Sequence, residues 1–379
     1  MKILFLVYHG FSDVSGISKK IHYQVKGLRE NGHEVRLCYY DFDGQGHRCR
    51  YIDGEVLKDY GTGTMAAIRQ RVDYQPVYDY CRLNGIEFVY ARSFQNANPF
   101  LISFFKKLRK LGIKSVTEIP TYPYDQEFRT FHWKMRLGLK VDQLFRNRLA
   151  QEMSAIVTFS DADRIFGQRT IRISNGVDFD SIPLHHYMAP QDGSIHLIGV
   201  AEVHIWHGYD RLIKGLGEYY RNATNPRQVY FHIVGGVHPH DMNVGTTWYP
   251  AFQTMIDEYG IQDRIVFHGQ LFGEELDKVF NQSCFAIGSL ARHRSGITII
   301  KTLKNREYAT RGIPFIYSET DSDFEDKPYI VKAPANESPI DIGQILDFID
   351  SHHFLPQEIR QTVEHLTWKI QMQQVVSQA

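Results

Sequence analysis

One loop of the sequence gathers three side chains that can carry positive charge. The stretch SLARHRSG, residues 289–296, follows an apolar run and brings together Arg292, His293 and Arg294. Guanidinium groups bind phosphate oxygens in bidentate geometry, so cations at the carboxyl end of a strand suit a diphosphate. The alternative is a solvated loop with no ligand.

The segment that follows concentrates charge on one short predicted helix. TLKNREYATRGIP, residues 302–314, reads as a helix that stops at Gly312, with Lys304 and Glu307 three residues apart. Such a pair is either a solvated ion pair on a helix face or part of a ligand site. The neighbouring segments decide between these two interpretations.

Two further segments place a helix start directly after a predicted strand. In AEVHIWHGYDRLIKGL, residues 201–216, His207 opens an amphipathic helix, where it can contact phosphate oxygens or simply cap the helix. In HGFSDVSGISKK, residues 9–20, Gly16 allows close backbone approach, and a helix N-terminus favours an anion or sugar hydroxyls. The segment lacks G-x-G-x-x-G, which counts against a dinucleotide cofactor and leaves a plain tight turn as the alternative.

Composition indicates a globular, two-domain protein. The chain has 379 residues, of which 43% are hydrophobic and 23% are charged, and its formal net charge is zero. A neutral balance gives no hint of nucleic acid. Four scattered cysteines without a C-x-x-C pair suggest a reducing compartment. The start, MKILFLVYHG, lacks a small-residue cleavage site, and no apolar run approaches the roughly 20 residues that span a bilayer. We therefore expect a cytoplasmic protein.

Apolar runs alternate with helical patterns along the chain, which is typical of an α/β fold with parallel sheets. Two such series are separated by the turn-forming residues Asn175, Gly176 and Pro183. We expect two Rossmann-like doubly wound domains, 1–178 and 179–355, facing a cleft where ligands bind. The remaining segment, 356–379, is predicted to be helical. The predicted strands are 2–8, 33–40, 88–93, 115–120, 155–160, 195–201, 229–236, 265–270, 284–290 and 314–319.

Several of these segments resemble the retaining glycosyltransferases of the GT-B fold, specifically a divergent bacterial member of glycosyltransferase family 4. REYATRGIPFIYSE is similar to that family's LEAMACGTPVV segment, with Glu307 on the second glutamate of its Glu-x7-Glu motif. HGYDRLIKGL is similar to its KGxDxLIxA segment, with His207 in place of lysine. IVFHGQLFGEEL, SNGVDFDSI and LTWKI resemble the segment that contacts the base, the interdomain segment and a closing helix that crosses back to the N-terminal domain.

The resemblance implies a nucleoside-diphosphate-sugar donor site in the C-terminal domain. Glu307 would hold the donor ribose, and Lys304 and Arg292 would stabilise the departing diphosphate as catalytic residues. The sequence departs from the family at Ile299, where the first glutamate of the motif is missing, and at Glu202, where an arginine is usual. The complete expected donor set is Gly16, His207, Gly235, Gly236, Gly269, Arg292, Arg294, Thr302, Leu303, Lys304 and Glu307.

The acceptor is expected in the N-terminal domain. TEIPTYPYDQEF, residues 117–128, carries Glu118, which could orient the acceptor hydroxyl, and Tyr122 and Tyr124, which could stack on sugar rings; an ordered structural turn is the alternative. We expect no cofactor and no metal, and we interpret Asp321-Ser322-Asp323 as a surface loop. The resemblance implies transfer with retention by front-face attack, in polysaccharide or glycoconjugate biosynthesis.

Other functions of the same architecture stay open. An inverting GT-B glycosyltransferase, a sugar-nucleotide epimerase and a non-catalytic nucleotide-sugar-binding protein would share the cleft. The acceptor would be a glycan or a lipid-linked molecule, because residues 104–148 combine aromatic residues with many lysines and arginines. A basic amphipathic helix of this kind could make peripheral contact with an anionic membrane at the inner membrane face. In the alternative, Phe131, Trp133 and Leu137 face the core and the cations are merely solvated.

Overall fold

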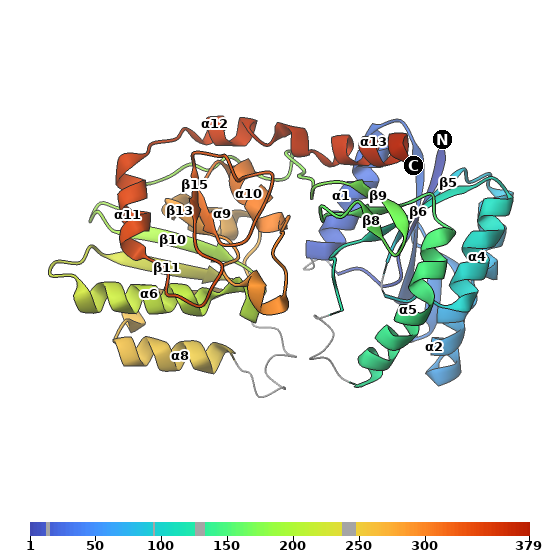
Figure 1. Cartoon of the computed structure of the whole chain (residues 1–379), viewed down its shortest axis with the longest axis horizontal. Helices are drawn as coiled ribbons and strands as arrows, with labels where there is room; N and C mark the ends of the chain where they lie inside the picture. Colours follow the sequence, from blue (N-terminus) through green and yellow to red (C-terminus); the bar gives the residue numbers. More distant parts are fainter. Residues whose placement is uncertain (13–15, 94, 126–132, 237–247) are drawn as a thin grey trace. The chain divides into compact units, whose positions relative to one another are not determined.

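The computed structural model describes residues 1–12, 16–93, 95–125, 133–236 and 248–379 (Figure 1). The chain forms two compact units. Unit 1 comprises Met1–Gly176 and Leu366–Ala379, and unit 2 comprises Val177–His365. None of the described helices is long and apolar enough to cross a membrane.

A mixed sheet forms the centre of unit 1. Its described strands lie in the order β4-β3-β2-β1-β5-β6-β7-β9-β8. Strand β1 pairs in parallel with β2 on one side and with β5 on the other, which is the strand-order reversal of a doubly wound fold. The predicted strands of this half are present as β1 (Lys2–Leu6), β2 (Glu34–Phe42), β5 (Phe88–Arg92), β6 (Lys114–Ile119) and β7 (Ala155–Thr158).

Two antiparallel hairpins in this sheet were not predicted. Strands β3 (Arg48–Ile52) and β4 (Glu55–Asp59) join through Asp53 and Gly54, both with positive φ, at 50° and 92°. Strands β8 (Arg164–Ile165) and β9 (Gln168–Arg172) form the second hairpin. A two-residue Asp-Gly turn is a strong hairpin signal, because a type I′ turn needs positive φ at both positions.

A returning helix completes unit 1. Helix α13 (Trp368–Gln378) packs along α1 (Gly16–Glu30), and Figure 1 shows the two side by side near the C-terminus. The contact requires Gly27, because a Cβ there would lie 2.7 Å from the carbonyl oxygen of Trp368. The other helices are α2 (Gly63–Val72), α3 (Gln75–Leu83), α4 (Pro99–Lys110) and α5 (Trp133–Gln151).

The predicted closing helix, 356–379, is divided in the structure. Helix α12 (Pro356–Gln361) belongs to unit 2, where Arg360 donates hydrogen bonds to the carbonyl oxygens of Phe179 and Ile182 at 2.7 and 2.9 Å. A 3₁₀ turn at Glu364–Leu366 then leads into α13. Only the part from Leu366 onward packs with unit 1.

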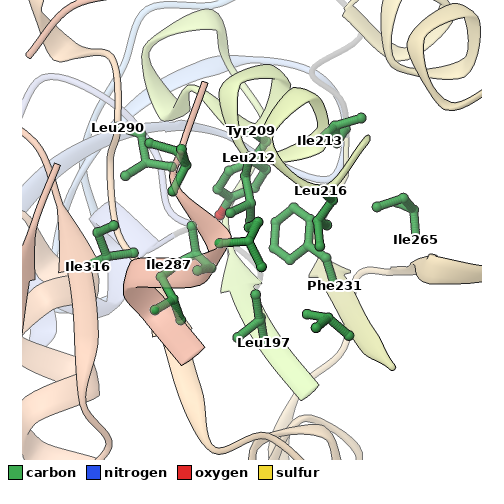
Figure 2. Packing of buried hydrophobic residues seen from close by; sticks show 14 of the residues in the cluster. Leu197, Tyr209, Leu212, Ile213, Leu216, Phe231, Ile265, Ile287, Leu290 and Ile316 are labelled. Atoms are coloured by element: carbon green, nitrogen blue, oxygen red, sulfur yellow. The ribbon is translucent and has the colours of Figure 1, made fainter. Parts of the chain in front are cut away.

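Unit 2 is built on a parallel sheet whose described strands lie in the order β12-β11-β10-β13-β14-β15. Tyr209, Leu212 and Leu216 of the first helix face this sheet, and the Tyr209 ring meets Phe231 edge-on at 5.3 Å (Figure 2). The strands are β10 (Ile195–Val200), β11 (Val229–Val234), β12 (Ile265–Gly269), β13 (Phe285–Ile287), β14 (Phe315–Tyr317) and β15 (Ile330–Lys332), the last of which was not predicted. The helices are α6 (Tyr209–Asn222), α8 (Trp248–Tyr259), α9 (Gly273–Gln282), α10 (Leu303–Arg311) and α11 (Ile342–Ser351).

A buried ion pair anchors α10 in unit 2. Arg306 is completely buried, and its guanidinium contacts both oxygens of Asp321 at 2.5 and 2.8 Å and also Asp323. Asn305 donates a further hydrogen bond to Asp321 at 3.1 Å. The interpretation of Asp321-Ser322-Asp323 as a surface loop is therefore wrong for Asp321, which is 0% exposed because it neutralises a buried arginine.

Replacing Asp321 tests this anchor. We expect Asp321→Asn to lower the free energy of unfolding by about 3–5 kcal/mol, because it leaves the buried Arg306 with too little negative charge. Asp326→Asn, which changes an exposed carboxylate of the same loop, should alter it by less than about 0.5 kcal/mol. Urea denaturation of the full chain measures both, and equal effects of the two variants would contradict the anchoring role.

Candidate functional site

The side-chain amine of Lys304 is a buried polar group of unit 2 without a hydrogen-bond partner among the described residues. It lies in the first turn of α10, over the Tyr209 ring at 5.5 Å from the centroid. Its Nζ atom is buried and makes no hydrogen bond with any described residue. Burial, and then the nearby charge of Arg292, lower the pKa of Lys304 well below its usual value. A buried amine that faces another cation is stabilised in its charged form by a bound anion.

His207 lies beside this amine as a neutral hydrogen-bond donor. Its ring Nδ1 accepts a hydrogen bond from the backbone N–H of His204 at 2.9 Å, so the neutral ring carries its hydrogen on Nε2. Burial, followed by the charges of Lys304 and Arg292, lowers the pKa of His207 well below its usual value. The alternative interpretation, a cap of the amphipathic helix, is wrong, because the N-cap of α6 is Gly208; the His207 ring instead caps the preceding 3₁₀ turn at Ile205–His207.

Backbone hydrogen bonds hold the 3₁₀ turn at Ile205–His207 against the loop 289–296, which carries Arg292 and Arg294. Leu290 N–H donates to the carbonyl oxygen of His207 at 3.0 Å, and Ala291 N–H donates to that of Trp206 at 3.2 Å. The next residue, Gly208, has a φ of 65°, and a Cβ there would lie 2.9 Å from Leu290 and Ala291. This close approach places the ends of β10 and β13 side by side.

The two arginines of the predicted cationic loop have different surroundings. The Arg292 guanidinium lies over the Trp206 ring at 5.2 Å from the centroid, and its charge contributes to the lowered pKa of both His207 and Lys304. Arg294 instead forms a bidentate pair with Asp210 at 2.9 and 2.8 Å and a second pair with Glu337.

The contacts of Arg294 contradict its predicted role as a phosphate ligand. Its Nη1 also donates to the carbonyl oxygen of Ile205 at 2.8 Å, and its Nε donates to Glu337 at 3.0 Å, so every guanidinium nitrogen is engaged. His293 is bound in the same way, between Glu319 at 3.2 Å and Glu337 at 2.8 Å. Arg294 therefore positions the loop that also carries Arg292.

Glu307 lies one turn further along α10. Arg311 donates from Nε to Glu307 Oε1 at 3.0 Å and from Nη1 to Asp277 at 2.7 Å. The Glu307 side chain is 30% exposed, and its Oε2 makes no hydrogen bond with the described residues. One carboxylate oxygen is thus positioned by Arg311 and the other can accept hydrogen bonds from a ligand.

The remaining predicted donor residues differ in how the fold uses them. Gly235 has a φ of 127°, and a Cβ there would lie 1.8 Å from the carbonyl oxygen of Ala201, so it permits the close approach of the loops after β10 and β11. Its N–H donates to the carbonyl oxygen of Gly269 at 2.6 Å, which ties in the end of β12. Gly236 accepts from Val203 N–H at 2.7 Å.

Three predicted residues border open space or lack a partner. Gly16 begins α1 in unit 1 and is exposed, and a Cβ there would have no described atom within 4 Å. Thr302 precedes α10, and its buried Oγ1 makes no hydrogen bond with any described residue. Leu303 is 37% exposed and adjoins Lys304 in sequence.

The predicted acceptor residue Glu118 is completely buried inside unit 1. Lys20 Nζ and Arg92 Nε lie 3.3 and 3.4 Å from its Oε1. Its Oε2 accepts hydrogen bonds from Gln24 at 2.6 Å and Tyr90 at 2.5 Å. Burial alone would raise the pKa of Glu118, but Lys20, Arg92 and these hydrogen bonds together lower it. Because no oxygen of Glu118 is exposed, the structure contradicts its predicted catalytic and acceptor-binding role.

The two predicted acceptor tyrosines pack against the protein. Tyr124 is 3% exposed, and its hydroxyl donates to Asp142 at 2.7 Å, so its ring is not available for stacking on a sugar. Tyr122 is half-buried and meets Phe166 edge-on at 5.9 Å. The sequence did not indicate Lys20 and Arg92, which reach the carboxyl ends of the unit 1 strands; burial lowers the pKa of Lys20 to about 8.

Comparison with solved structures identifies the architecture. Sucrose-phosphate synthase from Thermosynechococcus elongatus matches with a TM-score of 0.66 and 14% identity, over 99% of this chain and 97% of that chain. HepE of Anabaena in complex with UDP matches with a TM-score of 0.55 and 14% identity, over 100% of this chain and 95% of that chain. The catalytic domain of starch synthase IV from Arabidopsis thaliana bound to ADP and acarbose matches with a TM-score of 0.61 and 12% identity, over 99% of this chain and 98% of that chain. This chain has the GT-B fold.

No protein-family model and no curated protein sequence matches the chain. The GT-B fold therefore rests on structural likeness, and the roles of individual residues rest on the contacts within each unit. In unit 2, His207 lies in the segment that follows β10, and Arg292 and Lys304 both follow β13. Among the described residues, no group of three histidines, cysteines or carboxylates could hold a metal ion.

Proton uptake tests whether Lys304 is an anion site. A bound diphosphate should raise the lowered pKa of Lys304, so the complex holds more protons than the unbound protein and affinity falls as pH rises through the range between the two pKa values. We expect calorimetry of UDP or ADP binding in buffers of different ionisation enthalpy to detect this uptake. Lys304→Gln should abolish it, whereas Lys278→Gln, at an exposed position on α9, should not. Unchanged uptake in Lys304→Gln would contradict the assignment.

Proposed function

We propose that this chain is a glycosyltransferase that moves a hexosyl group from a nucleoside-diphosphate sugar to a glycan or lipid-linked acceptor. The observation that supports this most strongly is the buried Nζ of Lys304, which has no hydrogen-bond partner among the described residues. The proposed transfer releases a nucleoside diphosphate, and a buried amine of this kind would bind its negatively charged phosphates. HepE and starch synthase IV were solved with UDP and ADP, respectively.

The proposed catalysis is electrostatic. As the glycosidic bond breaks, negative charge accumulates on the diphosphate, and Lys304 and Arg292 are positioned to stabilise it. Neutral His207 would donate a hydrogen bond from Nε2 without adding a third charge to the unliganded site. We propose that the departing phosphate accepts the proton of the acceptor hydroxyl, so that transfer proceeds on one face with retention. No protein nucleophile takes part in this scheme.

Two successive turns of α10 would recognise two different parts of the donor. At its first turn Lys304 would bind the diphosphate, and one turn later Glu307 Oε2 would accept hydrogen bonds from the ribose hydroxyls. The glycines after β11 and β12, Gly235 and Gly269, would support the nucleoside through backbone positions. Acceptor recognition is proposed for unit 1. Glu118, Lys20 and Arg92 are buried and paired with one another, so other groups of that unit would contact the acceptor.

Two substitutions separate the two ends of the donor. Arg292→Ala should weaken UDP binding by about 1.5–3 kcal/mol, roughly tenfold to a hundredfold, and leave uridine binding unchanged. Glu307→Ala should weaken UDP and uridine binding equally, because both contain the ribose. Calorimetry with these ligands, and with ADP and adenosine, measures the difference. Glu274→Ala, at an exposed site on α9, is the matched control. Equal losses for both ligands in Arg292→Ala would contradict its diphosphate role.

A turnover assay tests the reaction itself and the proposed independence of metal. A thermal-shift screen of nucleotide sugars first identifies the donor, and release of its nucleoside diphosphate is then followed with and without EDTA. We expect release, even if slow, to persist in EDTA and to be lost in Lys304→Gln. Loss in EDTA that is restored by manganese would contradict metal independence. Tight donor binding without any release would instead indicate a non-catalytic binding protein.

A further inference from the structure

Helix α5 carries more apolar surface than its packing uses. Its inner face supplies Leu139 and Ala150 to a core cluster with Ile119 and Ile156. On the same face Asp142 is buried and accepts hydrogen bonds from Tyr124 and from the backbone of Ala97. This face attaches the helix to unit 1 and accounts for its burial.

A second apolar stripe on α5 faces solvent. Leu137, Val141 and Leu144 are 56%, 39% and 73% exposed. Their spacings of four and three residues place them on one side of the helix, over a length of about 10 Å. The alternative in which the apolar residues face the core is therefore wrong for Leu137, whereas Phe131 and the side chain of Trp133 lie outside the part of the chain that the structure describes. Large exposed aliphatic side chains aligned in this way mark an interaction surface when they occur together.

The charge around this stripe is positive. Helix α4, which packs beside α5, carries four basic residues and no acidic one; α5 carries five basic residues and one acidic residue, the buried Asp142. The whole chain, in contrast, has 43 basic and 43 acidic residues. Arg109 and Arg146 are paired with Glu152 and Asp125. The other described basic side chains of the two helices are exposed: Lys106, Lys107, Lys110, Arg136, Lys140 and Arg148.

We propose that the exposed face of α5, with the flanking cations of α4, docks unit 1 onto an anionic lipid membrane. Aliphatic side chains that insert shallowly between headgroups, surrounded by lysine and arginine, are the features such a surface recognises. A soluble polyanion would use the cations but not Leu137 and Leu144, so the apolar stripe favours lipid. The inference does not depend on the proposed sugar transfer, since vesicle binding needs neither donor nor acceptor.

Vesicle co-sedimentation of the full chain without sugar nucleotide tests the proposal. We expect binding to phosphatidylcholine vesicles that contain phosphatidylglycerol, and little binding to phosphatidylcholine alone. The double variant Leu137→Ser/Leu144→Ser should lower the partition coefficient about tenfold or more. Leu83→Ser is the matched control, because Leu83 is 74% exposed in unit 1 but lies on α3. Arg136→Gln/Lys140→Gln should lower it about thirtyfold, whereas Lys58→Gln, an exposed site on β4, should not.

The outcomes distinguish lipid from its alternatives. Binding should weaken at about 1 M salt, where the Debye length is roughly 3 Å. Absence of binding, or equal binding to neutral and anionic vesicles, would overturn the proposal. Binding that depends on the cations but not on the two leucines would also overturn it and would indicate a soluble polyanion. Because all substituted residues are exposed, thermal melting of each variant should match the parent chain.

Discussion

The pairing of Arg306 with Asp321 determines how α10 is oriented, and most of the candidate donor site depends on that orientation. Successive residues of a helix are separated by about 100°, so Lys304 lies on roughly the opposite side of the axis from Arg306. With Arg306 held in the interior of unit 2, Lys304 must face the His207 turn. Asp321 thus acts on the ligand site without being part of it.

The site also depends on unequal compensation of charge. Arg294 is neutralised by Asp210 and Glu337, and it fixes the loop that carries Arg292. Lys304 has no hydrogen-bond partner among the described residues, and burial, followed by the charge of Arg292, lowers its pKa. Such a site favours an anion, because a bound anion stabilises the charged form of Lys304 that burial disfavours.

The sequence predicted the sheets better than the side-chain environments. All ten predicted strands are present, because buried parallel strands read as continuous apolar runs. The hairpin at Asp53-Gly54 was missed although its turn signal is visible. Arg292 and Arg294 could not be told apart, because the partners of Arg294 come from positions 210 and 337. Glu118 was misassigned for a reason that the sequence contains: it lies within an apolar strand rather than after it.

The division of unit 1 has a consequence for synthesis on the ribosome. The sheet of unit 1 is complete by Arg172, but the groove at Gly27 on α1 is filled only by Trp368, which follows the whole of unit 2. Domains usually fold as they emerge, N-terminal first. The nascent first half must therefore persist with an uncovered apolar strip until unit 2 has been translated. Packing of α13 on α1 is then the last step in the folding of unit 1, and it takes place only after unit 2 has been synthesised.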